Sequence, residues 1–258
     1  SKFFNKTNFI LVIHNDPLNL KGSMTISQRK KLLEICYKIY FVSSWVEDKF
    51  FEGIDKNFYN NFKTIYPSIN KITKFPKKDN VIIFSGKLNL AKGFDKFATA
   101  IIKILNKYKN WKSIIIGDEP REKYFFKHPR LLFTGWIPQD KVLSLYEKSS
   151  ITVVPSLWEE PFGRSSLEAG SRGNAVIISK KGGLPETINN PTFLKKVNSI
   201  SSESEIEKLI KNKKLLKLKQ FVSFKNPLHI IKNNIKIIDE DRKNALLPFK
   251  KININKNS

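Results

Sequence analysis

The 258-residue sequence has little cysteine and little histidine. Cys36 is the single cysteine, so the chain cannot form an internal disulfide, and with only three histidines a structural zinc site is not expected. No stretch approaches the roughly 18 uninterrupted apolar residues of a membrane span, and residues 1–8 lack the basic-then-apolar pattern of a signal peptide. We therefore expect a soluble, cytoplasmic protein without a metal or redox centre.

Acidic residues are also scarce, with 23 Asp and Glu against 47 Lys and Arg, which gives a formal net charge of +24. Only six of these basic residues are Arg, and specific nucleic-acid readers rely on clustered Arg. The heavy use of Lys, Asn, Ile and Phe indicates a compositional bias of the coding sequence, so no nucleic-acid partner is expected. Peripheral contact with the anionic inner face of a membrane is compatible with this charge.

Hydrophobic residues make up 40% of the chain, as in a globular protein, and strand-like apolar runs alternate with helix-period segments. This alternation predicts an α/β fold with parallel sheets. In the first part we expect strands over 9–13, 40–43 and 64–66, a helix capped at Ser27 that reaches Ile39, and a helix over 45–51. Residues 1–70 are predicted to be the C-terminal part of an N-terminal Rossmann-like domain, which is too short to close a doubly wound sheet and is therefore expected to be truncated.

A polar, Lys-rich stretch without periodicity at residues 71–79 is predicted to be a linker. A second alternation follows over 80–226 and predicts a doubly wound, Rossmann-like domain. Its expected strands are 81–84, 113–116, 131–133, 151–154 and 175–178. Residues 227–258 are predicted to be a helical segment that becomes a polar tail after Asn244.

A glycine-bounded segment, Gly86-Lys87-Leu88-Asn89-Leu90-Ala91-Lys92-Gly93, lies between a predicted strand and a predicted helix. Open α/β sheets bind ligands beyond the carboxyl ends of their strands, which is where this segment falls. Gly86 and Gly93 permit close backbone approach, and Lys87 and Lys92 supply cations for a diphosphate. By itself the segment is only slightly more indicative of a phosphate site than of an ordinary loop.

Residues 155–169, PSLWEEPFGRSSLEA, are more informative because they join the strand over 151–154 to a helix predicted to begin near Arg164. The free N–H groups of a helix N-terminus favour an anion. Glu160 falls in the loop and Glu168 in the early turns of the helix, so the two carboxylates should have separate roles. We predict that Glu168 accepts hydrogen bonds from ribose hydroxyls, as the acidic residue of dinucleotide folds does.

In this pattern the sequence resembles the family 4 glycosyltransferases, retaining enzymes of the GT-B class in which two Rossmann-like domains face a cleft. Glu160 and Glu168 form the E-x₇-E signature of that family. The other matching motifs, in the same order, are Gly86-Lys87-Leu88…Lys92-Gly93, Gly117-Asp118, Gly135-Trp136-Ile137 and Gly182-Gly183-Leu184-Pro185-Glu186. The sequence departs from the family pattern at Lys87, where Arg is common, and at Ala175, where Pro is common.

The resemblance implies a donor site for a nucleotide-sugar co-substrate and no resident metal. Lys87 and Lys92 would neutralise the diphosphate, Gly86 would allow its close approach, and Glu160 would orient the sugar. The remaining donor-binding positions would be Ile137 near the base, Phe162, Gly163, Arg164 and Ser165 around the phosphates, and Glu168 at the ribose. The expected catalytic residues are Glu160, Lys92 and His14, although His14 at a strand end has a purely structural role as its alternative.

The function expected from this resemblance is a metal-independent, hexosyltransferase-type retaining glycosyltransferase. It would move a sugar from a nucleotide-diphosphate donor to a glycan or lipid-linked acceptor, in the synthesis of cell-envelope polysaccharide or lipopolysaccharide. The alternatives are a nucleotide-sugar-binding but catalytically inactive fragment and, third, a basic nucleic-acid-binding protein. Neither the base nor the sugar of the donor follows from the sequence.

Overall fold

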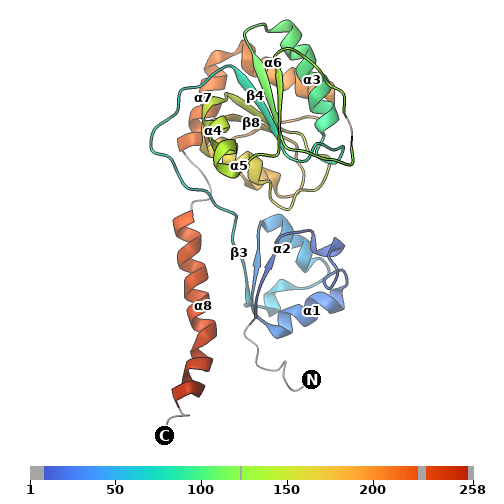
Figure 1. The fold of residues 1–258 in the computed structure, drawn as a ribbon. Coiled ribbons are helices and arrows are strands. Elements are labelled where there is room, and N and C mark those ends of the chain that lie inside the picture. The colour runs from blue at the N-terminus through green and yellow to red at the C-terminus, as the bar shows by residue number, and fades with distance from the viewer. Residues whose placement is uncertain (1–8, 123, 226–230, 255–258) are drawn as a thin grey trace. The chain divides into compact units, whose positions relative to one another are not determined.

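The structure is a computed structural model and describes residues 9–122, 124–225 and 231–254. The chain divides into two compact units (Figure 1). The first comprises the described residues up to Ser68 together with the C-terminal helix, and the second those between Ile69 and His229. Each unit contains a sheet whose paired strands are parallel, as the alternation of strands and helices predicts.

The first unit is built on a three-stranded sheet in the order β1-β2-β3. Its strands are β1 (Phe9–Ile13), β2 (Cys36–Phe41) and β3 (Phe62–Thr64), connected by α1 (Ile26–Ile35) and α2 (Ser44–Phe51) and by the short 3-10 turns η1 (Pro17–Asn19) and η2 (Lys56–Phe58). An aromatic cluster forms its core, in which the ring of Phe51 lies 4.5 Å from that of Phe62 and 5.4 Å from that of Phe50. The long helix α8 (Ile231–Ile254) belongs to this unit, and the Tyr40 hydroxyl donates to Asp241 on it.

The predicted boundaries in the first unit were wrong at several points. The cap of α1 is Thr25 instead of Ser27, because Thr25 forms a reciprocal capping box with Gln28, each side chain accepting from the other's backbone N–H at 3.2 Å. The helix ends at Ile35, and Cys36 already pairs with β1 in a strand. The third strand begins two residues early, at Phe62, and α8 continues past Asn244 where a polar tail is predicted.

The second unit contains a six-stranded parallel sheet in the order β6-β5-β4-β7-β8-β9. The strands are β4 (Val81–Ser85), β5 (Lys112–Ile116), β6 (Leu131–Gly135), β7 (Ile151–Val154), β8 (Ala175–Ile178) and β9 (Thr192–Phe193). The first five agree with the predicted strands to within two residues, and β9 was not predicted. Within this sheet, β4 is central, β5 and β6 follow on one side of it, and the chain then crosses to β7 on the other side. This is the doubly wound order.

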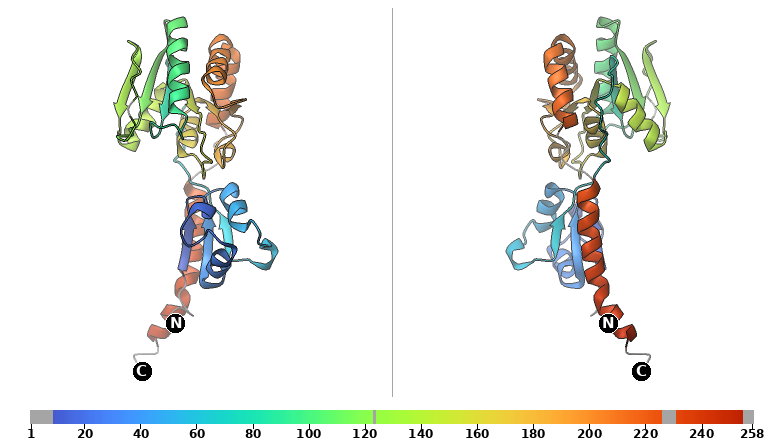
Figure 2. Two further views of the ribbon diagram at one scale, coloured as in Figure 1. Left: turned by 90° about the vertical axis from the view of Figure 1, so that its right-hand side faces the viewer. Right: turned by 90° about the vertical axis from the view of Figure 1, so that its left-hand side faces the viewer.

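Helices of the second unit cover both faces of this sheet, as the two side views in Figure 2 show. They are α3 (Phe94–Lys107), α4 (Gln139–Lys148), α5 (Arg164–Ser171), α6 (Ser199–Lys211) and α7 (Lys213–Lys225), with the 3-10 turn η3 (Leu184–Glu186). One buried cluster joins α3 and α6 to one face, and a second joins α4 and α5 to the other. Apolar strands buried on both faces explain the continuous hydrophobic runs of the sequence.

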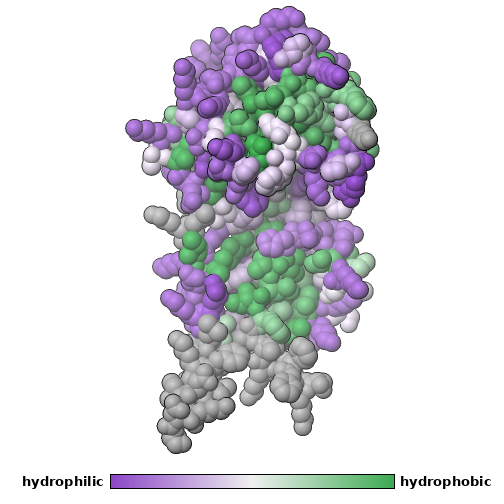
Figure 3. Space-filling model, in the orientation of Figure 1, coloured by the Kyte–Doolittle hydropathy of each residue, from purple (hydrophilic) through white to green (hydrophobic). Residues whose placement is uncertain are grey.

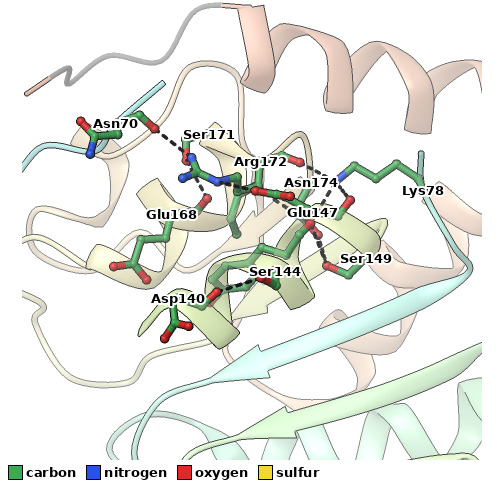
Figure 4. Close-up of polar contacts among 12 residues, drawn as sticks. Asn70, Lys78, Asp140, Ser144, Glu147, Ser149, Glu168, Ser171, Arg172 and Asn174 are labelled. Atoms are coloured by element: carbon green, nitrogen blue, oxygen red, sulfur yellow. Dashed lines mark hydrogen bonds and ion pairs between the residues drawn. The ribbon is translucent and has the colours of Figure 1, made fainter. Parts of the chain in front are cut away.

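Residues 71–79, predicted to be a linker, contact the second unit. The ammonium group of Lys78 donates to the carbonyl oxygens of Tyr146 and Glu147 at 2.9 and 3.0 Å, and also to that of Arg172. These carbonyls lie at the C-terminal ends of α4 and α5, where a cation stabilises the helix dipole (Figure 4). Burial lowers the pKa of Lys78 to about 7. Lys78 thus satisfies backbone groups of the folded domain, so this end of the stretch is part of the second unit.

Asn174 holds the start of β8 against the same two helices (Figure 4). Its side chain is buried, and its Nδ2 donates to the carbonyl oxygens of Tyr146 at 2.7 Å and Ala169 at 3.1 Å. Its Oδ1 accepts from the hydroxyls of Ser149 at 2.6 Å and Thr152 at 3.2 Å. Because each buried polar atom of this side chain has a partner, Asn174 ties α4 and α5 to the strands β7 and β8.

Candidate functional site

The candidate site lies at the carboxyl edge of the second sheet, between β4 and β7. Strand order reverses there, because β5 and β6 extend to one side of β4 while β7 to β9 extend to the other. The loops that leave two neighbouring strands in opposite directions open a crevice at such a switch point. Residues 86–93 follow β4 and residues 155–163 follow β7, so both sequence motifs reach the same crevice.

Glycine lets these loops come within backbone contact. Gly93 has φ +68°, and a Cβ atom there would lie 2.0 Å from the carbonyl oxygen of Pro155. Directly beside this contact, the N–H groups of Leu157 and Trp158 both donate to the carbonyl oxygen of Ala91, at 2.9 and 3.0 Å. Backbone hydrogen bonds therefore join the segment 86–93 directly to the loop after β7.

Lys92 and Glu160 form an ion pair at the point where the two loops meet. The Lys92 Nζ lies 2.6 Å from Oε1 and 2.8 Å from Oε2 of Glu160. The Glu160 side chain is 8% exposed and that of Lys92 31% exposed, so the cation stands on the solvent side of the pair. An ammonium group has three N–H donors, and two of them suffice for this carboxylate, which leaves one for a further anion.

Two helix N-termini flank this ion pair. Gly93 precedes α3 and Gly163 precedes α5, both glycines are left-handed, and neither helix has a side-chain cap. No acidic residue lies in the first turn of α5, so its free N–H groups at Arg164 and Ser165 keep their partial positive charge for a ligand. Lys87 is exposed on the neighbouring loop. Cations and helix N-termini at one place make this part of the crevice suited to a phosphate group.

Glu168 lies one turn into α5, where it is 8% exposed. Its Oε1 accepts hydrogen bonds from Gln139 Nε2 at 2.7 Å and from Arg164 Nη2 at 3.2 Å. Its Oε2 accepts no hydrogen bond from the residues that the structure describes. The carboxylate is thus fixed in orientation by two donors while one oxygen remains for a ligand hydroxyl.

Comparison with known proteins agrees with this arrangement. The family model for glycosyl transferases group 1 matches residues 66–232. This chain belongs to the glycosyl transferases group 1 family. The putative glycosyltransferase YtcC of Bacillus subtilis is 25% identical over 232 residues, which are 78% of this chain and 57% of YtcC. The lipopolysaccharide core biosynthesis mannosyltransferase LpcC of Rhizobium leguminosarum is 30% identical over 115 residues, which are 40% of this chain and 32% of LpcC.

The fold is also that of solved GT-B glycosyltransferases. The crystal structure of Anabaena HepE in complex with UDP matches with a TM-score of 0.71 and 16% sequence identity, covering 90% of this chain and 71% of HepE. The predicted α/β fold of the GT-B class is thereby confirmed. The chain spans about half of YtcC and a third of LpcC.

The other predicted site residues of this group 1 family member have different settings. Gly86 directly follows β4, and a Cβ atom there would have no atom within 4 Å, so its surface is open to a ligand. Ile137 follows β6 and is half-buried, packed against the cluster under α4 and α5. Phe162 is buried, with 3% exposure, so it can offer a ligand its backbone but not its ring. His14 is exposed at the end of β1 in the first unit.

Glu159 organises the loop after β8 and was not among the predicted site residues. Its carboxylate accepts from Lys181 Nζ at 2.7 Å and from the Gly182 N–H at 2.6 Å. The carbonyl oxygen of its neighbour Glu160 accepts from the Gly183 N–H at 2.7 Å, and a Cβ atom on Gly182 would lie 2.1 Å from that oxygen. In the sequence, Gly182-Gly183 directly after Lys181 was the pattern that could have indicated this contact. Lys181 is thus paired with Glu159. Gln139 was also not predicted as a site residue, because its partner Glu168 is 29 residues away in the sequence.

The loop after β5 forms another side of the crevice. Glu119 is 6% exposed, and the Arg121 guanidinium donates to both of its oxygens, at 2.7 and 2.9 Å. These bonds, with a smaller contribution from the charge of Lys87, lower the pKa of Glu119 to about 2. Glu122 accepts from the Leu90 N–H at 3.3 Å, which ties this loop to residues 86–93. The charge of Lys87 thus acts on the Glu119 carboxylate across the crevice loops.

Proposed function

We propose that this protein is a retaining glycosyltransferase that transfers a sugar from a nucleoside-diphosphate donor. One observation carries the proposal: the Lys92–Glu160 ion pair stands at the strand switch point between two helix N-termini that have no side-chain caps. Such a site combines a cation, oriented N–H groups and a carboxylate within one crevice. A sugar diphosphate has both the anion and the hydroxyl groups that these groups would bind.

The cations would act on the leaving group. When the bond between the sugar and the diphosphate breaks, negative charge builds up on the departing phosphate oxygen. Lys92, Lys87 and the free N–H groups at the start of α5 would stabilise this charge in place, without reorganisation during the reaction. A metal ion is not required for this step in our proposal, in which the leaving phosphate also assists deprotonation of the acceptor on the same face of the sugar.

The two carboxylates would bind the neutral parts of the donor. Glu160, held by Lys92, would accept hydrogen bonds from sugar hydroxyls and so orient the donor. The unoccupied Oε2 of Glu168 would accept a ribose hydroxyl, while Gln139 and Arg164 keep the side chain in position. Ile137 would lie near the base and His14 would serve the transfer step from the first unit.

The acceptor and setting rest on the relatives. LpcC of Rhizobium leguminosarum is named for lipopolysaccharide core biosynthesis, which supports a glycan or lipid-linked acceptor in cell-envelope polysaccharide synthesis. HepE was crystallised with UDP, which supports a nucleoside diphosphate as the ligand of the second unit. We therefore propose a cytoplasmic hexosyltransferase of envelope assembly.

Calorimetric titration with UDP, GDP and ADP, with and without a chelator, tests the donor site. We expect saturable binding of one nucleotide, insensitive to the chelator and weakened by Glu168→Ala. Loss of binding on chelation would contradict metal independence. Equal affinity of the wild-type chain and Glu168→Ala would contradict the role of Glu168 at the ribose.

Alanine variants of two lysines, Lys92 and Lys96, test the phosphate contact. Lys92→Ala should weaken binding of the diphosphate by about 10- to 100-fold, the effect of one charge-assisted hydrogen bond, and leave binding of the free nucleoside unchanged. Lys96→Ala is the control, because Lys96 is 41% exposed and pairs with Asp95 on α3. Equal losses for nucleoside and nucleotide would mean that Lys92→Ala distorts the crevice through the uncovered Glu160, and would contradict the contact.

A further inference from the structure

Helix α7 has an apolar surface that its own domain does not cover. One side of the helix is buried in the second unit, at Leu216, Gln220, Ser223 and Phe224. On the other side Leu218 is 54% exposed and Phe221 50% exposed. These residues are three apart and therefore neighbours on one helix face, so they form a continuous apolar strip toward solvent.

A groove runs between this strip and the segment before β4. It is lined by Phe75, Pro76, Lys77, Lys78, Lys217, Leu218, Gln220 and Phe221, which we call the α7 groove, and has a volume of about 780 Å³. Phe75 is 42% exposed, yet its ring also contacts that of Phe224 edge-on at 5.1 Å, which fixes the segment against the helix. Figure 1 shows the two elements beside each other at the margin of the second unit.

Positive charge surrounds the α7 groove. Neither residues 71–78 nor residues 211–225 contain an acidic residue, whereas they contain Lys at 71, 74, 77, 78, 211, 213, 214, 217, 219 and 225. Lys78 and Lys219 are bound to carbonyl oxygens of the domain. Lys77, Lys214 and Lys217 are exposed, and the Lys225 ammonium lies 5.5 Å from the centre of the Phe221 ring. The face of the second unit that Figure 3 shows has hydrophilic residues with hydrophobic ones between them.

We infer that the α7 groove docks on the surface of an anionic lipid bilayer. A helix with Leu and Phe flanked by Lys, and without acidic residues, has the composition of an interfacial amphipathic helix. Leu218 and Phe221 would enter the boundary between headgroups and acyl chains, and the lysine stems would lie along the apolar surface with their ammonium groups at lipid phosphates. Docking would hold the second unit at the membrane without a spanning segment; none of the described helices is long and apolar enough to cross one.

A nucleic acid fits this surface less well than a bilayer. Bidentate contacts to base edges rely on Arg, and residues 71–78 and 211–225 contain no Arg. Leu218, at the centre of the strip, offers neither a stacking face nor a hydrogen bond, but it gains from burial in hydrocarbon. The combination of Leu218 with the surrounding lysine ammonium groups therefore favours a lipid bilayer over a nucleic acid.

Vesicle co-sedimentation of the full chain tests the inference. Vesicles of phosphatidylcholine with phosphatidylglycerol should sediment the protein, and vesicles of phosphatidylcholine alone should not. The double variant Leu218→Ser/Phe221→Ser should lower the partition coefficient at least tenfold, and Lys217→Ala should lower it about fivefold. The matched control is Leu132→Ser/Phe125→Ser, since Leu132 is 57% and Phe125 86% exposed elsewhere on the same unit.

An environment-sensitive label distinguishes insertion from loose adsorption by the net charge of +24. Cys36 is buried, so a Leu218→Cys variant can be labelled selectively at the groove, with Leu132→Cys as its control. The label at position 218 should shift its emission to the blue when phosphatidylglycerol vesicles are added, and the label at 132 should not.

Three outcomes would overturn the inference: equal sedimentation of Leu218→Ser/Phe221→Ser and the wild-type chain, no emission shift at position 218, or a loss of heparin binding in the double variant as large as its loss of vesicle binding. The last would assign the apolar strip to an acidic macromolecule instead of lipid. None of these measurements uses a nucleotide or a sugar, so the inference and the proposed transferase function fail or hold separately.

Discussion

The contact between Gly93 and Pro155 predicts that a single methyl group will force the two loops of the candidate site apart. Gly93 and Gly135 have almost the same φ, +68° and +67°, in the region that favours glycine. A Cβ atom on Gly93 would lie 2.0 Å from the Pro155 carbonyl oxygen, whereas a Cβ atom on Gly135 would have no atom within 4 Å. The pair therefore separates the cost of the left-handed conformation from the cost of the steric clash.

The conformational cost of alanine is about 1–2 kcal/mol in the left-handed region, and it applies to Gly93→Ala and Gly135→Ala alike. Gly93→Ala adds an overpacking cost of about 1–3 kcal/mol, because the clashing atom belongs to the backbone and cannot rotate away. Each kcal/mol lowers the melting temperature of a domain of this size by about 2–4 °C. We expect Gly93→Ala to melt several degrees below Gly135→Ala.

Thermal unfolding followed by circular dichroism measures this difference, with nucleotide titration of both variants as a second readout. Gly93→Ala should also weaken nucleoside-diphosphate binding, because Lys92 and the start of α3 move with the glycine. Equal melting temperatures for the two variants would refute the reasoning, since they would mean that the loops separate at no cost and that Gly93 is required for its φ alone.

Three further predictions concern the polar groups of the second unit. Asn174→Ala should lower the free energy of unfolding by about 3 kcal/mol, measured by urea denaturation, because it leaves buried carbonyls and hydroxyls without partners; a loss below 1 kcal/mol would contradict this. Because the pKa of Lys78 is lowered to about 7, the folded state binds fewer protons than the unfolded state above that pH, so stability should rise with pH from about 7 toward the ordinary pKa of lysine. The slope, at most about 1.4 kcal/mol per pH unit, should disappear in Lys78→Met. Gln139→Ala should weaken nucleotide binding less than Glu168→Ala does, and a larger loss would mean that Gln139 contacts the ligand itself.

The sequence was sufficient for the elements whose signal is local. The strands β4, β5, β7 and β8 are mostly apolar runs, and α3 has one apolar face at helical spacing, so their residues predict them directly. In contrast, Cys36 to Ile39 fit a helical pattern as well as a strand, and pairing with β1 decides for the strand. The same holds for Lys78, whose ammonium group donates to carbonyl groups of helices that lie far along the chain.

The candidate site divides in the same way. The sequence by itself determined which loops carry glycine, lysine and glutamate, because a strand, a glycine-bounded turn and a helix start follow one another within a few residues. It also placed Glu160 in a loop and Glu168 in a helix.

Only the tertiary structure decided which of these groups meet. Lys92 and Glu160 are 68 residues apart, and they form one ion pair because the strand order reverses between β4 and β7. Glu168 and Gln139 meet because α4 and α5 pack side by side on one face of the sheet. Local patterns set the conformation of each segment, whereas pair distances depend on the packing of the whole sheet.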